Sequence, residues 1–352
     1  MPFDRATCTM ALVAWLLFAK CGLFLPLDRV RRDLELQGAH VSSSTLTRWF
    51  IRGAELLAPI WVATRAELLA SDHIATDGTG LLVIHPRKKG ESHEAPHRGQ
   101  ILVFCNAEVA VYFYTPTKDG FHAEDFLAVC EVDGEPVLWK GTITADAVRS
   151  QDILFLDGDR IEGGCNAHGF RKFRDDADKA PLLAMTAMGF IDAMFDAEAH
   201  AKKRGLTGAE LLTYRQQHAL PHSEKLRVWL GEHIEDLLPS NPVRKAMQYY
   251  INHWHALMLW LTDPSVPPDN NASERALRHL ALLRNNALFA GGPEGALRVC
   301  TVLTLVQTCR LIGVDPFAYL EWALSRIVPH PDNRGLAAVD LTPSAYKRAQ
   351  QA

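Results

Sequence analysis

The sequence predicts an α/β protein with a sheet-containing core, a large all-helical block and helical segments at both ends. Short β-branched and aromatic runs, typical of strands, cluster between residues 73 and 145. Helical periodicity covers residues 1–70 and returns from about residue 170. Hydrophobic residues make up 48% and charged residues 22% of the chain, which excludes a wholly disordered or collagen-like protein.

Charge and cysteine content limit the classes of function. The 352 residues include 37 Lys and Arg against 41 Asp and Glu, so nucleic-acid binding would have to rest on local patches. The seven cysteines are widely spread without a Cys-x-x-Cys pair, which favours a reducing cytoplasm over a secreted disulfide framework. The apolar run over residues 10–19 is too short to cross a bilayer, so we expect a buried helix and no membrane partner.

The first 70 residues are expected to be helical. Apolar residues over 27–36 lie roughly on one helix face, a Gly-containing turn follows, and the serines at 42–44 can cap a second helix. Two helices with this connection fit a helix-turn-helix that places Arg48 in a DNA groove. A plain helical hairpin within a bundle explains the same pattern, so both interpretations stay open.

From residue 73 the hydrophobic period changes to that of strands. Residues 73–84, 100–105 and 108–114 are predicted to form three antiparallel strands joined by turns. A short helix over residues 121–129 and a fourth strand over 140–145 follow. This order of elements is that of a ribonuclease-H-like core, an analogy of fold that does not by itself establish a function.

The remaining chain is expected to be mostly helical. Proline and glycine residues divide the helical block into several helices, and Asp269-Asn270-Asn271 can start a later one. The expected organisation is an N-terminal helical segment (1–70), the first part of the core (71–169), the helical block (170–265), a core helix carrying an acidic residue (266–300), a C-terminal helical element (301–330) and a polar tail (331–352).

Three carboxylates stand out by their joint placement. Asp77 lies within the first predicted strand, where Asp is disfavoured, although an Asp-Gly turn is an alternative. Asp146 ends the fourth strand, where Asp also commonly starts a helix. Glu274 lies early on a late helix, at capping-box spacing from Asn271. Each residue alone has an ordinary structural explanation.

In a ribonuclease-H-like sheet these elements would bring the three carboxylates together. Two such charges 4 Å apart repel by about 4 kcal/mol at an effective dielectric constant of ~20. Divalent Mg²⁺ or Mn²⁺, which prefer hard oxygen ligands, would relieve this repulsion. Two ions about 3.5–4 Å apart can activate a water or a 3′-hydroxyl at a phosphodiester. We therefore expect polynucleotide phosphoryl transfer, with Asp77, Asp146 and Glu274 as metal ligands.

A weaker indication of a metal site lies between Asp146 and the helical block. Cys165 and His168 have half of a zinc-site spacing, but no second Cys or His pair lies nearby in the sequence. Packing or helix-start roles are the better explanation of these two residues.

Four segments carry a resemblance to a known family. They are DNNASERALRHLALLRNNALFAG (269–291), CNAHGFRKF (165–173), GVDPFAYL (313–320) and the helical residues 25–49. On these motifs the chain resembles a transposase of the insertion sequence 66 family, whose members carry a DDE catalytic triad. The resemblance runs from about residue 11 to about residue 328. It implies a short form without the amino-terminal coiled coil and zinc-binding segment of longer members.

The resemblance implies metal-dependent DNA strand cleavage and strand transfer by a ribonuclease-H-like core into which the helical block is inserted. Mg²⁺ or Mn²⁺, two ions, would be the cofactor. Besides Arg48, the residues Arg275, Arg278 and Arg284 would contact DNA phosphates, with solvation of surface cations as the alternative. The expected partners are transposon ends, target DNA, a second subunit in a synaptic complex and accessory proteins of the element. The expected location is the bacterial cytoplasm, associated with the nucleoid.

Two aspartates compete for the second position of the triad. Asp146 precedes Cys165 by 19 residues, close to the family spacing, whereas Asp157 precedes it by 8 but is followed by Gly as in the family. Spacing favours Asp146. The chain departs from the family at Gly78, which replaces Glu, and at Asn285, which replaces Lys. A decayed copy that only binds DNA and a nuclease without strand transfer are therefore the alternatives.

Overall fold

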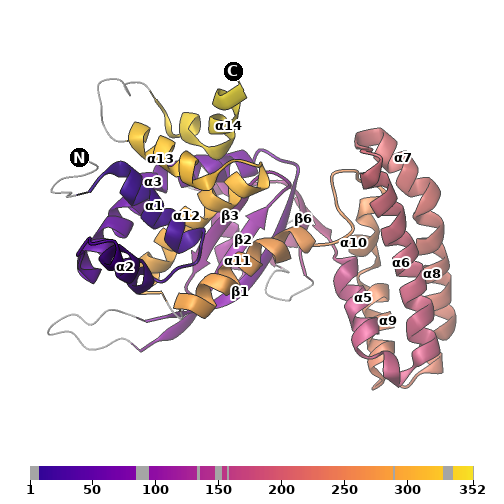
Figure 1. Cartoon of the computed structure of the whole chain (residues 1–352). Coiled ribbons are helices and arrows are strands. Elements are labelled where there is room, and N and C mark those ends of the chain that lie inside the picture. Colours follow the sequence, from indigo (N-terminus) through magenta and orange to yellow (C-terminus); the bar gives the residue numbers. More distant parts are fainter. Residues whose placement is uncertain are drawn as a thin grey trace. The chain divides into compact units, whose positions relative to one another are not determined.

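The computed structural model describes residues 8–84, 95–132, 135–146, 153–156, 158–287, 290–327 and 336–351, and it is a mixed α/β structure. The chain divides into two compact units, each of which is described by itself (Figure 1). The first unit comprises Met1–Ser71, Asp77–Trp139 and Ala272–Ala352. The second unit comprises Asp72–Thr76 and Lys140–Asn271, so strand β1 (His73–Val83) contributes to both.

Three helices begin the first unit, as the sequence predicts: α1 (Met10–Cys21), α2 (Leu27–Leu36) and α3 (Ser43–Leu68). The Ser42 side chain accepts a hydrogen bond from Thr45 N–H at 3.1 Å and caps α3. Helix α3 runs for 26 residues and buries Trp49 and Phe50, whereas Arg48 is exposed. No helix in the described ranges is long and apolar enough to cross a membrane.

The sheet of the first unit has the order β3-β2-β1. Strands β2 (His97–Cys105) and β3 (Ala110–Thr115) pair antiparallel, with Cys105 opposite Ala110. Helix α4 (Phe121–Leu127) ends two residues earlier than expected, because Ala128 begins a hairpin of β4 (Ala128–Val132) and β5 (Glu135–Leu138). The sequence analysis missed this short hairpin.

Helices at the end of the chain complete the first unit. They are α11 (Asn271–Ala287), α12 (Pro293–Leu311) and α13 (Pro316–Ile327). Helix α12 packs on β3, where Thr304 accepts a hydrogen bond from Tyr112 N–H at 2.9 Å. The expected polar tail instead forms a 3₁₀ turn (Ala338–Leu341) and α14 (Pro343–Gln351). This segment is packed rather than free because the buried Tyr346 ring contacts Tyr319 and Trp322.

The second unit combines a small parallel sheet with a helical bundle. Strand β6 (Gly141–Thr144) pairs with the first residues of β1, with Ala75 opposite Thr144, and on its other side with β7 (Arg160–Gly163). Strand β7 has only four residues, two of them charged, and was not predicted. Helices follow, as expected: α5 (Asn166–Asp175), α6 (Pro181–Lys203), α7 (Gly208–His218), α8 (Leu220–His233), α9 (Pro242–Asn252) and α10 (Trp254–Met258).

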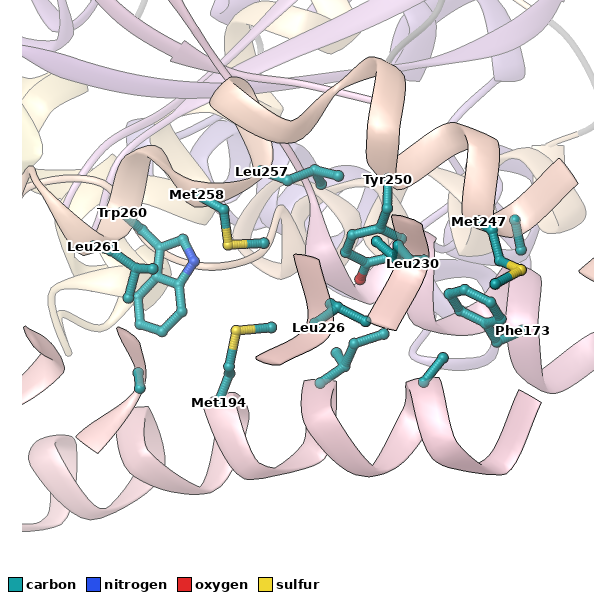
Figure 2. Packing of buried hydrophobic residues seen from close by; sticks show 14 of the residues in the cluster. Phe173, Met194, Leu226, Leu230, Met247, Tyr250, Leu257, Met258, Trp260 and Leu261 are labelled. Carbon is teal, nitrogen blue, oxygen red and sulfur yellow. The ribbon is translucent and has the colours of Figure 1, made fainter. Parts of the chain in front are cut away.

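The bundle has one apolar core. Figure 2 shows side chains from different helices meeting in it, among them Met194, Leu226 and Tyr250. A charged pair lies at the edge of this core: the guanidinium of Arg215 on α7 contacts both carboxylate oxygens of Glu198 on α6, at 2.8 and 2.9 Å. Both side chains are almost fully buried, so this pair links α6 to α7.

Candidate active site

Asp77 lies on β1 in the first unit and is half-buried. Its Oδ1 accepts a hydrogen bond from Gly78 N–H at 2.6 Å. A Cβ atom at position 78 would lie 2.2 Å from the Gln100 side chain and 2.8 Å from that of Leu102. These side chains of β2 therefore occupy the space that the family's Glu would need. A residue larger than glycine at position 78 would require these side chains to move.

Glu274 lies in the first turn of α11 and is half-buried. The helix begins at Asn271, whose backbone N–H and side-chain amide both donate to Asp269, at 3.0 and 2.7 Å. Glu274 is thus the fourth helical residue, one position beyond the place that a capping box requires. Asp269 accepts the first backbone N–H of the helix and so caps its start.

The charges of Asp77 and Arg275 both affect the pKa of Cys105, a buried thiol in the first unit. Burial raises the pKa of Cys105 to about 12, the positive charge of Arg275 lowers it, and the negative charge of Asp77 raises it further. Cys105 ends β2, whereas Arg275 follows Glu274 on α11. A positive charge therefore lies close to the end of β2 on the helix that carries the third acidic residue.

The four candidate DNA-binding arginines differ in their surroundings. Arg48, Arg275 and Arg278 are exposed. Arg284 is half-buried, and its Nη1 donates to Thr79 Oγ1 at 3.1 Å and to the Gly80 carbonyl at 2.9 Å. Part of its guanidinium therefore holds β1 just beyond Asp77.

A cavity of about 260 Å³ opens beside Arg275 in the first unit. Arg275, His279 and Arg310 line it, and the amide of Gln307 lies buried at its wall. The Gln307 Nε2 donor has no hydrogen-bond partner among the described residues. Burial and the charge of Arg310 lower the pKa of His279, so this ring is neutral near pH 7. The sequence analysis missed this donor-rich cavity because its residues come from separate helices.

Asp146 follows β6 in the second unit and is half-buried. Its Oδ1 lies 2.7 Å from Nδ1 of His168, and Cys165 lies beside both. Burial works against the charge of His168, but hydrogen bonds and charges from Asp146 and Cys165 outweigh it and raise the pKa of His168 to about 10. Cys165 and His168, which have half of a zinc-site spacing in the sequence, therefore have Asp146 beside them as a third potential metal ligand. Asp157, the competitor of Asp146, lies outside the described residues.

Asn270 joins the start of α11 to two neighbours in the second unit. Its side-chain amide donates to the Thr76 carbonyl at 2.8 Å, one residue before Asp77. Its backbone N–H donates to Cys165 Sγ at 3.2 Å. The side chain is fully buried. The paired asparagines of the sequence motif thus have separate roles, because Asn271 binds Asp269 while Asn270 holds β1 and the cysteine.

The three expected ligands fit a hard divalent cation by the chemistry of their donors. Asp77, Asp146 and Glu274 each offer carboxylate oxygens on a half-buried side chain, the donor type that Mg²⁺ and Mn²⁺ prefer. The structure describes Asp77 and Glu274 in the first unit and Asp146 in the second. Among described residues, Asp146 is the one with softer sulfur and nitrogen donors beside it.

Comparisons with known proteins give the family. Residues 5–298 match the model described as Transposase IS66 family, and residues 304–335 match the IS66 C-terminal element. Two proteins of Sinorhizobium fredii strain NGR234, described as uncharacterized proteins y4hP and y4jD, are 29% and 26% identical over 97% and 92% of this chain. The chain spans 63% and 64% of their lengths. No solved structure matches significantly. Because the family model covers most of its length, this chain belongs to the IS66 family of transposases.

Proposed function

We propose that the protein is a DDE transposase that cleaves DNA strands at the ends of an insertion sequence and transfers them to target DNA. The observation that carries the proposal is the position of the three carboxylates within a chain of this family. Asp77 lies on β1, Asp146 lies two residues after the end of β6, and Glu274 lies in the first turn of α11. Each of the three side chains is half-buried. A metal ligand in an active site contacts the protein on one side and faces the substrate on the other, and half-burial fits this role.

The register of β1 and β6 supports a ribonuclease-H-like arrangement. Ala75 pairs with Thr144 in the parallel ladder, and Asp77 and Asp146 each follow their paired residue by two positions. Side chains two residues apart lie on the same face of a strand. In open sheets of this kind, ligands bind at the carboxyl ends of parallel strands. The register thus favours Asp146 over Asp157 as the second acidic residue.

The three carboxylates would hold the divalent ions. Two such ions, when bound, would activate a water or a DNA 3′-hydroxyl as the nucleophile and stabilise the leaving oxygen. Asp77, Asp146 and Glu274 would orient the scissile phosphodiester through these ions. Hydrogen bonds hold β1 on both sides of Asp77. Asn270 donates to the Thr76 carbonyl, and Arg284 donates to Thr79 and to the Gly80 carbonyl.

DNA contacts would come from the arginines. Arg48, Arg275 and Arg278 are exposed and can donate to phosphate oxygens. The cavity beside Arg275 offers Arg310 and Gln307 as further donors. We propose that transposon ends and target DNA bind here, within a synaptic complex of two or more subunits and with any accessory proteins of the element, on the bacterial nucleoid.

The test is a cleavage assay with Mg²⁺ on DNA that carries the ends of the element. Asp77→Asn, Asp146→Asn and Glu274→Gln are each expected to abolish cleavage without changing the melting temperature or DNA affinity, because metal binding needs the charge. Glu294→Gln is the matched control, since Glu294 is also an acidic residue in the first turn of a helix, α12, and is exposed. It should cleave like wild type.

The products separate the proposal from its alternatives. Joining of the cut 3′ end to target DNA supports a transposase. Nicking without joining would indicate a nuclease, and binding without nicking would indicate a decayed copy. If Glu274→Gln lowered the melting temperature while cleavage per folded molecule stayed unchanged, a structural role for Glu274 would replace the catalytic one.

A further inference from the structure

The strongest cluster of metal-ligating side chains in the described part of the chain lies in the second unit. One carboxylate oxygen of Asp146, the Cys165 sulfur and a His168 ring nitrogen all lie within 4.8 Å of one another. Tetrahedral Zn²⁺, bound at about 2.0–2.3 Å, holds its ligands about 3.3–3.8 Å apart. The three side chains therefore need shifts of about 1 Å or less to surround one ion.

We propose that Asp146, Cys165 and His168 bind a thiophilic divalent cation of the Zn²⁺ or Co²⁺ class. Thiolate and imidazole ligands select such ions over Mg²⁺, which prefers oxygen. The cysteine and histidine each give up a proton to solvent on binding. Three protein ligands leave a fourth position, and the exposed edges of Asp146 and His168 open it to water. This inference goes beyond the proposed cleavage but shares Asp146 with it, since one of the two carboxylate oxygens of Asp146 contacts His168.

The backbone presents the three ligands at one edge of the small parallel sheet. Thr144 on β6 pairs with Gly163 on β7, and Asp146 and Cys165 each follow this pair by two residues. Cys165 also precedes α5, so His168 lies in the first turn of that helix. The ligands thus come from two adjacent strand ends and a helix start, all held by regular hydrogen bonding.

The Cys165 sulfur is held in a fixed position by burial and by one backbone hydrogen bond. Cys165 is fully buried, and its Sγ accepts the backbone N–H of Asn270 at 3.2 Å. Burial is the main cause that raises the pKa of Tyr249, and the nearby Cys165, Asp146 and Glu162 raise it further, so these acidic groups lie in one region around this ring. This region attracts a cation.

The closest ordinary explanation is a plain His–Asp ion pair. The chain contains such a pair without a cysteine: His233 Nδ1 lies 2.7 Å from Asp236 Oδ2. His233 is therefore the matched control for His168, because it has the same carboxylate contact at the same distance. Cys105, a buried free cysteine in the first unit, is the matched control for Cys165.

The experiment titrates the metal-free full chain with Co²⁺ and follows absorption. One equivalent is expected to give the intense near-ultraviolet thiolate-to-cobalt band, which Zn²⁺ then removes by displacement. His168→Gln should weaken binding at least tenfold, and Cys165→Ser should abolish the band. His233→Gln and Cys105→Ser should bind like wild type.

Two results would overturn the inference. They are a titration without the thiolate band, and a band that persists at full strength in His168→Gln. His168 is partly exposed, so this variant tests the site even if Cys165→Ser does not fold. The Mg²⁺ cleavage assay separates the two proposals. A protein that cleaves DNA but gives no cobalt band keeps the transposase function and loses this metal site.

Discussion

Replacing Arg215 with Met should destabilise the helical bundle severely. Arg215 donates to both oxygens of Glu198, and its Nη1 also donates to the carbonyls of Trp260, Asp263 and Val266 at 2.8–3.1 Å. Its guanidinium lies 5.2 Å from the Trp260 ring centre. One side chain thus neutralises a buried carboxylate and satisfies three carbonyls where the bundle closes after α10.

The magnitude follows from these contacts. Removing one partner of a buried ion pair costs about 3–5 kcal/mol, because the other charge stays buried without compensation. The carbonyls that lose their donor add at least about 1 kcal/mol. We expect a loss of about 4–6 kcal/mol, which is comparable to the whole stability of many domains. Lys202, 3.7 Å from Glu198, is exposed and cannot replace Arg215.

Urea unfolding followed by far-ultraviolet circular dichroism measures the loss. The double variant Arg215→Met with Glu198→Leu removes both charges and should recover most of the about 3–5 kcal/mol that the uncompensated carboxylate costs. Arg174→Met is the control, since Arg174 contacts Asp175 at the surface, and it should cost under about 1 kcal/mol. A loss below about 1 kcal/mol for Arg215→Met, or a double variant no more stable than the single one, would refute the reasoning.

Three further predictions concern DNA binding, pH and the second aspartate. Arg48→Ala should weaken DNA binding and its salt dependence without lowering the melting temperature, as measured by fluorescence anisotropy at several salt concentrations. Burial lowers the pKa of His73 from 6.5 to about 4, against an opposing effect of Asp263. Because the unfolded chain binds a proton at this residue before the folded protein does, the free energy of unfolding should decrease as the pH falls below about 6.5. The loss approaches about 3 kcal/mol near pH 4, and urea unfolding of His73→Asn should show a flatter pH profile. Asp157→Ala should leave metal-dependent cleavage within a few-fold of wild type, in contrast to Asp146→Asn.

The sequence predicted the elements with strong periodicity. Helices α1 to α3, strands β1 to β3 and β6, and helix α11 lie within a few residues of their expected positions. Periodic apolar residues and capping residues such as Ser42 are local features, so they can be recognised from the sequence of one segment alone. The placement of Asp146 at a strand end and of Glu274 early on a helix came from the same local signals.

Elements whose stability comes from distant partners were missed. Strand β7 exists because it pairs with β6, and its own sequence, Arg-Ile-Glu-Gly, carries no strand pattern. Helix α14 is held by the contact of Tyr346 with Tyr319, which no local period reveals. The third member of the cysteine–histidine cluster was missed for the same reason. Asp146 reaches His168 through strand pairing, not through spacing along the chain.

The hydrogen bond from Asn270 to Thr76 has a consequence for how the chain is made. Its two residues are 194 positions apart, and a ribosome adding about 5–20 residues per second takes ~10–40 s to cover that distance. During that interval the Thr76 carbonyl lacks this donor, although β6, which pairs with the first residues of β1, has already been made. A nascent chain that stops before residue 270 therefore contains both strands of the β1–β6 pair but lacks the hydrogen bonds that Asn270 makes to Thr76 and Cys165.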